Sequence, residues 1–228
     1  MLPWDGPLPV PQLRTIEEIR GVLMDKSCEC RAPLYSMYRD LAKSKKDRDW
    51  LRGEGLRYDL TVIPPRTLCG EYVKTKGHHH PPNGKDVPYP EIYEVLQGEA
   101  HYLLQTRDAG EVRLVKADEG DLVLVPPGFG HVTINPGRKT LSMANIVSTR
   151  FESDYSSYER LHGAAYFEVK GGDLVRNPNY PRAAEIQTYE AREQVALRSL
   201  PSGPLYNLIG TGSLGFLNHP EEYPDLFS

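Results

Sequence analysis

The stretch GDLVLVPPGFGHVTIN, residues 120–135, decides the fold of this chain. An apolar run over residues 122–125 stops at the Pro-Pro-Gly sequence 126–128, and a second β-prone run follows it. Proline and glycine punctuate strands and favour tight turns, so the stretch predicts two short strands joined by a turn. His131 lies just past that turn, where a side chain can face the interior of a sheet.

Similar short runs occur on both sides of this stretch, bounded by Gly, Pro, Asn and Asp at intervals of about ten residues. They are LRYDLTVI, CGEYVKT, IYEVLQGEAHYLLQT, EVRLVKA, DLVLVPP, HVTINP and LSMANIV. This spacing is typical of an antiparallel sandwich or barrel. The sequence therefore predicts an all-β core over residues 56–155.

The ends of the chain differ in composition from this core. Residues 1–55 predict an N-terminal arm whose short capped helix, over 15–26, packs on the barrel. The polar stretch 44–55 predicts a solvated loop or the end of a helix. Residues 156–228 are expected to form a C-terminal extension that packs on the barrel or on a partner subunit, with one possible helix over 183–198.

Charge and composition exclude several classes of partner. The 228 residues include 27 basic and 31 acidic side chains, giving a net charge of −4. No strong field attracts nucleic acid or an anionic membrane, and no apolar run is long enough to cross a bilayer. The start of the chain lacks the pattern of a signal peptide. Three cysteines favour reduced thiols over a disulfide scaffold, and together these features predict a cytoplasmic protein.

Two histidines one residue apart, His78 and His80, give the strongest chemical signal. Side chains alternate between the faces of a strand, so these two point the same way and His79 points the opposite way. With the carboxylate of Glu91 and the imidazole of His131 they read as one site for a divalent transition metal. The blander alternative is an accidental polar run of three histidines on the surface.

Two motifs resemble those of the cupin family. The stretch 120–135 matches the second cupin motif at Gly120, Pro126, Pro127, Gly128, His131 and Asn135, and the first motif is matched by Gly77, His78, His80, Glu91 and Gly98. Cupins generally have three or four residues between the second histidine and the glutamate, whereas ten intervene here. The resemblance implies a cupin fold, which is a double-stranded β-helix or jelly-roll barrel.

A closer resemblance is to the archaeal cupin-type phosphoglucose isomerases. In that family TKGH-x-H is followed, after a longer gap, by Glu, an apolar residue and Tyr; here these are residues 75–78, 80 and 91–93. The match covers about residues 15–155. It implies that His78, His80, Glu91 and His131 bind the metal, that Glu91 and Tyr93 are catalytic, and that Tyr35, Thr61, Thr75, Gly77 and Thr133 contact the sugar phosphate.

The implied reaction interconverts glucose 6-phosphate and fructose 6-phosphate. Moving a proton between adjacent carbons passes most simply through an enediolate, whose charge a divalent metal stabilises. A hydride shift is the alternative route. We expect one divalent metal per subunit, with Fe²⁺ as first choice and Mn²⁺, Ni²⁺ or Zn²⁺ as alternatives.

Other functions fit the same ligand set. A different metal cupin enzyme, such as a dioxygenase or a decarboxylase, and a non-catalytic sugar-binding cupin are the alternatives. Where relatives often carry a tyrosine and a histidine after the last core strand, this chain has Val147 and Ser153. We expect a sugar-phosphate substrate, no nucleic-acid or membrane partner, and a homodimer.

Overall fold

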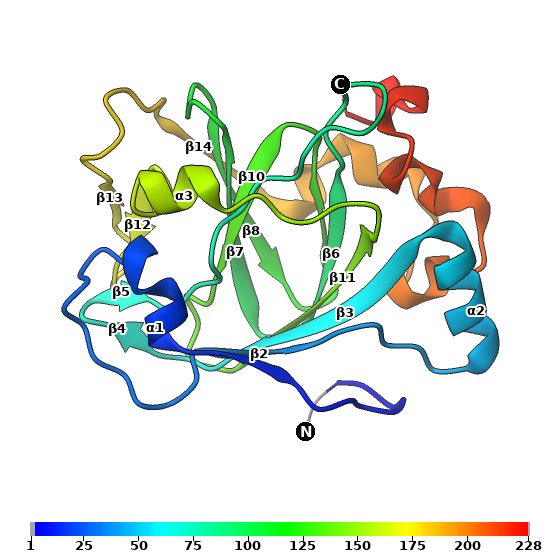
Figure 1. Ribbon diagram of the computed structural model, residues 1–228, viewed down its shortest axis with the longest axis horizontal. Helices are drawn as coiled ribbons and strands as arrows, with labels where there is room; N and C mark the ends of the chain where they lie inside the picture. Colours follow the sequence, from blue (N-terminus) through cyan, green and yellow to red (C-terminus); the bar gives the residue numbers. More distant parts are fainter. Residues whose placement is uncertain (1–2, 228) are drawn as a thin grey trace.

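A computed structural model describes residues 3–227, and two facing β-sheets form its centre (Figure 1). One sheet has the strand order β1-β2-β3-β11-β6-β9, with bounds Gln12–Arg14, Tyr35–Tyr38, Leu56–Ile63, Leu141–Ser148, Glu91–Gln97 and Leu122–Val125. The other has the order β10-β7-β8-β14, with bounds Phe129–Ile134, Glu99–Thr106, Val112–Asp118 and Ile186–Glu190. Two small sheets pair β4 (Thr67–Leu68) with β5 (Glu71–Tyr72) and β12 (Tyr166–Glu168) with β13 (Leu174–Arg176).

The helical segments are short and lie around these sheets. The α-helices are α1 (Ile16–Ile19), α2 (Lys45–Glu54) and α3 (Ser156–Arg160). The 3₁₀ turns span Arg20–Val22, Ala191–Glu193, Val195–Ser199, Leu205–Leu208, Gly212–Leu217, Pro220–Glu222 and Pro224–Leu226. Among residues 3–227 there is no helix with the length and hydropathy to span a membrane.

Strand pairing confirms the predicted all-β fold class. Every pairing between strands is antiparallel except that of β14 with β8, which is parallel. In the centre of the larger sheet, Asn145 of β11 lies opposite Asp59 of β3 on one side and Tyr93 of β6 on the other. Because side chains alternate, these three residues point into the barrel together.

The six-stranded sheet is buried on both faces. Its inner face packs against the second sheet, and its outer face carries Tyr58, Leu60 and Ile146, which belong to a second apolar cluster. Leu205 and Phe216, from the C-terminal 3₁₀ turns, complete that cluster. Figure 1 shows these turns beside α2, on the side of the barrel away from α1 and α3.

Three helix predictions need correction. The helix expected over 15–26 is a short α1 that continues as a 3₁₀ turn, although Glu18 does accept a hydrogen bond from the Thr15 N–H at 2.7 Å, as a capping box requires. The stretch 44–55 is not a loop but the helix α2, capped by Ser44 and ended by Gly55 at φ 67°. The helix expected over 183–198 is wrong, because its first half is strand β14.

The expectation of three reduced thiols is also wrong. Cys28 and Cys69 form a disulfide with Cα atoms 5.8 Å apart, and only Cys30 is a free thiol in the described chain. The two bonded cysteines are 41 residues apart in sequence, so no local pattern predicts that they meet. Cys28 therefore has no free thiolate with which to bind a metal alongside Cys30.

Candidate functional site

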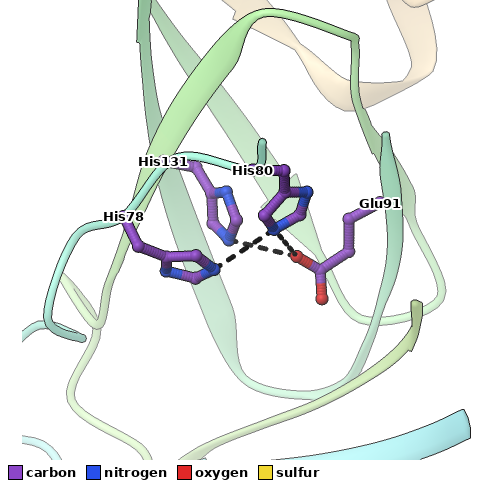
Figure 2. A group of neighbouring side chains, drawn as sticks. All are labelled: His78, His80, Glu91 and His131. Atoms are coloured by element: carbon purple, nitrogen blue, oxygen red, sulfur yellow. Dashed lines mark hydrogen bonds and ion pairs between the residues drawn. The ribbon is translucent and has the colours of Figure 1, made fainter. Parts of the chain in front are cut away.

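Four side chains that are distant in sequence converge inside the barrel (Figure 2). His78 and His80 come from the segment between β5 and β6, Glu91 begins β6, and His131 lies on β10. They line one end of a cavity of about 500 Å³. Each offers a ligand atom, and these four atoms all lie within 4.8 Å of one another.

The segment that carries the two histidines is held against β10 by backbone hydrogen bonds. The Thr75 N–H donates to the Thr133 carbonyl at 2.8 Å, and the His131 N–H donates to the His78 carbonyl at 3.0 Å. The segment therefore runs as an extended neighbour of β10, and its side chains alternate. His78 and His80 face the cavity, whereas His79 packs on the Tyr158 ring, as the spacing predicted.

The imidazoles present their Nε2 atoms to a common centre. The Nε2 atoms of His78 and His80 are 3.2 Å apart, and His80 Nδ1 lies 2.9 Å from the Tyr89 carbonyl, which only an N–H can satisfy. The His80 lone pair is therefore on Nε2. Burial lowers the pKa of both His78 and His131 well below the usual value, so both rings are neutral at pH 7.

Glu91 supplies the anionic member of the cluster and is almost fully buried. Its Oε1 accepts a hydrogen bond from Asn145 Nδ2 at 2.7 Å. Its Oε2 has no hydrogen-bond donor and lies 3.4 Å from His80 Nε2 and 3.3 Å from His131 Nε2. A buried carboxylate oxygen among nitrogen lone pairs is costly without a cation, so this donor set fits a divalent metal.

Tyr93 links this cluster to the wall of the cavity. Its hydroxyl lies 2.8 Å from His131 Nε2, and burial raises its pKa well above the usual value. Tyr93 therefore keeps its proton at pH 7 and can donate it in a hydrogen bond to the His131 lone pair or to a bound oxygen.

The residues expected to contact substrate do not all reach the cavity. Tyr35, Thr61 and Thr75 line it. Gly77 and Thr133 lie behind its lining: a Cβ on Gly77 would sit 2.3 Å from the Tyr158 ring, and Thr133 is buried. The roles of all five residues in substrate binding stay predictions.

Several polar residues of the cavity were missed by the sequence analysis. Arg14, Arg39, Arg57 and Asn145 line it together with Lys76 of the TKGH sequence. A signal for one of them was present, because a polar residue in the middle of an apolar strand needs a buried partner. Asn145 interrupts LSMANIV in that way.

Comparison with known proteins identifies the family. The model of the family described as Glucose-6-phosphate isomerase (GPI) matches residues 13–185. This chain belongs to that family. The glucose-6-phosphate isomerase of Pyrococcus furiosus is 30% identical over 178 residues, covering 75% of this chain and 88% of the relative. The glucose-6-phosphate isomerase of Thermococcus litoralis is 28% identical over 176 residues, covering 74% and 86%.

Among solved structures, the chain is more distantly similar to the formate complex of Lactobacillus farciminis oxalate decarboxylase. That likeness has a TM-score of 0.40 and 17% identity, and it covers 56% of this chain and 33% of the other. The family membership confirms the resemblance found in the motifs and places this chain among the isomerases. All four expected metal ligands lie within the matched segment.

Proposed function

We propose that this protein is a metal-dependent isomerase that interconverts glucose 6-phosphate and fructose 6-phosphate. One observation carries the metal dependence: three imidazoles and one carboxylate converge in a cavity, and a carboxylate oxygen there has no hydrogen-bond donor. Family membership supports the reaction.

His78, His80, Glu91 and His131 would hold the ion. When bound, a divalent metal supplies a Lewis acid that polarises the oxygens on the two reacting carbons of the sugar. Three imidazoles and one carboxylate suit several transition ions; Fe²⁺ is our first choice, and Mn²⁺, Ni²⁺ or Zn²⁺ are alternatives.

Glu91 is proposed to carry the proton between the two carbons. The reaction removes a proton from C2 of the aldose and returns one to C1, while a hydroxyl proton moves to the other oxygen. Asn145 fixes Oε1 of Glu91, which leaves the second oxygen directed at the cavity. Tyr93 can donate a hydrogen bond to a sugar oxygen on which negative charge develops.

The phosphate is proposed to bind at the side of the cavity lined by Tyr35, Thr61 and Thr75, where hydroxyl groups can donate to its oxygens. Arg14, which pairs with Tyr35 across β1 and β2, and Lys76 line the same side, where they form ion pairs with Glu18 and Glu159. Gly77 and Thr133 support this wall from behind, since Thr133 N–H donates to Thr75 Oγ1 at 2.9 Å.

The setting of the reaction is also part of the proposal. We propose that the protein is a cytoplasmic homodimer in which the Pro-rich terminal arms wrap a second subunit.

The proposal is tested by removing metal with a chelator, reloading with each of the four ions, and coupling glucose 6-phosphate formation to a dehydrogenase. We expect stripped protein to isomerise fructose 6-phosphate only after reloading. His131→Ala, measured in parallel, should bind less metal and remain inactive. Oxygen consumption without isomerisation would instead identify a different metal enzyme.

A further inference from the structure

A second charged group lies on the wall of the same cavity, on β3, which only β11 separates from β6, the strand that carries Glu91 and Tyr93. Asp59 is fully buried, and its Oδ2 accepts hydrogen bonds from Arg39 Nη1 at 2.6 Å and from Arg57 Nε at 2.8 Å. Its Oδ1 accepts from the Asp40 N–H at 3.0 Å. One carboxylate thus fixes two guanidinium groups, both of which line the cavity.

This group, the Arg39–Asp59–Arg57 cluster, is separated from the proposed phosphate end. Arg57, Asp59 and Thr61 alternate along the inward face of β3. Thr61 is four positions along the strand from Arg57, roughly 13 Å at the usual rise per residue. Thr61 lies beside Met37, two residues from Tyr35, so the hydroxyl groups gather beyond Thr61, away from Arg57.

The cluster keeps a positive charge and free donors. Two guanidinium groups share one carboxylate, which leaves one excess positive charge. Arg39 uses its second amino group on Met37 Sδ at 3.1 Å, whereas within residues 3–227 neither terminal amino group of Arg57 has a hydrogen-bond partner. The Arg57 side chain is 36% exposed. A planar pair of free N–H donors in a cavity is a binding geometry for carboxylate or phosphate oxygens.

Few acidic side chains line the cavity to compensate the positive charge of the cluster. Glu91, the anionic ligand, is engaged by Asn145, and the remaining acidic residue of the lining is Glu152. Along the inward face of β3 the cavity has basic residues at both ends: Arg14 and Lys76, which are paired with Glu18 and Glu159, lie near the hydroxyl groups, and the Arg39–Asp59–Arg57 cluster lies on the other side of Thr61. A sugar with a single phosphate can satisfy one end only.

We infer that Arg57, held by Asp59 and supported by Arg39, forms a second anion subsite that takes a phosphate or other anionic group on the far end of a sugar phosphate. The inference rests on the proposed function for the orientation of the sugar, because it places the first phosphate at the Thr61 and Thr75 side. The ligand class is a six-carbon chain with an anionic group at each end.

Calorimetric titration with two polyols that cannot be isomerised tests the subsite. Glucitol 6-phosphate carries one anionic end, and glucitol 1,6-bisphosphate carries two. The wild-type protein should bind the bisphosphate about tenfold more tightly, the effect of one charge-assisted contact in a partly exposed site. Both metal-loaded and metal-stripped protein should show this preference, because the cluster includes no metal ligand.

Arg57→Gln should abolish the preference while leaving the dissociation constant of glucitol 6-phosphate nearly unchanged. This variant should fold, since Asp59 keeps its bonds to Arg39 and to the Asp40 N–H. Thermal melting checks that. Arg57→Lys, which keeps the charge but loses the planar donors, should retain part of the preference. The exposed Arg182 is the matched control, and Arg182→Gln should change neither constant.

Three results would overturn the inference. They are equal affinity of the wild-type protein for the two polyols, an unchanged preference in Arg57→Gln, and an equal loss of preference in Arg182→Gln. The isomerase assay on the wild-type protein is scored separately. A preference for the bisphosphate without isomerisation would refute the proposed reaction and support the anion subsite. Isomerisation without that preference would support the reaction and refute the subsite.

Discussion

Asn145 shows how one neutral side chain can organise the metal site. Its Nδ2 donates to Glu91 Oε1 at 2.7 Å, and both residues are buried. The bond fixes the carboxylate so that its other oxygen faces His80 and His131. Groups that orient a ligand in this way influence metal affinity without touching the ion.

We predict that Asn145→Leu, which keeps the size of the side chain but removes the donor, weakens metal binding about 10- to 100-fold. The measurement is a competition titration against a chelating dye. Asn207 is exposed and its side chain forms no hydrogen bond within residues 3–227, so Asn207→Leu is the control. An unchanged affinity in Asn145→Leu would show that the hydrogen bond to Glu91 is unimportant for the metal.

Gly77 is constrained by packing rather than by backbone conformation. A Cβ at this position would lie 2.3 Å from the Tyr158 ring and 2.7 Å from Val132. We predict that Gly77→Ala destabilises the fold by about 1–3 kcal/mol, the usual cost of overpacking. Urea unfolding measures the effect. Gly84→Ala, at a site with nothing within 4 Å of the added Cβ, should be close to neutral.

At the scale of the element, α3 is short and depends on Asp154, two residues before its first residue. Asp154 Oδ1 accepts from the Ser156 hydroxyl at 2.5 Å and from its N–H at 2.9 Å, and Oδ2 accepts from Arg107 at 2.8 Å. The Asp154 backbone also pairs with His79, the outward-facing neighbour of two metal ligands. The residues at the start of α3 therefore fix the backbone of the segment that carries His78 and His80.

The same contacts predict a pH dependence of stability. Hydrogen bonds from Ser156, followed by the charge of Arg107, lower the pKa of Asp154 from 3.8 to about 2. A lowered folded-state pKa means that the ionised form is favoured in the folded protein, so the stabilisation is present above pH 4 and is lost as pH falls toward 2. Because Asp154 is partly exposed, solvent screening reduces its size.

Denaturant unfolding at pH 6 and at pH 2.5 measures this effect in the wild type and in Asp154→Asn. The variant should be less stable than the wild type at pH 6, and the difference should shrink at pH 2.5. A difference of the same size at both pH values would mean that Asp154 acts through packing and not through its charge.

Across the whole molecule, two long-range features hold the ends of the chain on the barrel. The C-terminal turns bury Leu205 and Phe216 against the outer face of β3 and β11. The Cys28–Cys69 disulfide joins the segment between α1 and β2 to the turn between β4 and β5. That turn precedes the segment that carries His78 and His80.

We predict that Cys69→Ser lowers the free energy of unfolding by about 2–4 kcal/mol, because the disulfide closes a loop of some 40 residues in the unfolded chain. Urea unfolding with and without dithiothreitol measures this. Reductant should bring the wild type down to the stability of Cys69→Ser and leave the variant unaffected. Cys30→Ser, which changes the free thiol, is the control.

The sequence by itself determined the parts of this protein that depend on local order. Turn residues at regular spacing marked the strands, alternation placed His78 and His80 on one face, and two motifs with fixed internal spacing indicated the ligand set and the family. The caps of α2, Ser44 and Gly55, were also present in the sequence, but its largely polar composition concealed a helix whose buried residue is Leu51.

Only the tertiary structure decided which distant residues meet. The pairing of β14 with β8 turned an apparent helix into a strand, because hydrogen bonds to a neighbouring strand outweigh weak local preference. The Cys28–Cys69 disulfide and the pairing of Asp59 with both Arg39 and Arg57 form because the fold brings separate segments of the chain together. Such contacts depend on strand register and on packing between segments, so the spacing of residues along the chain does not predict them.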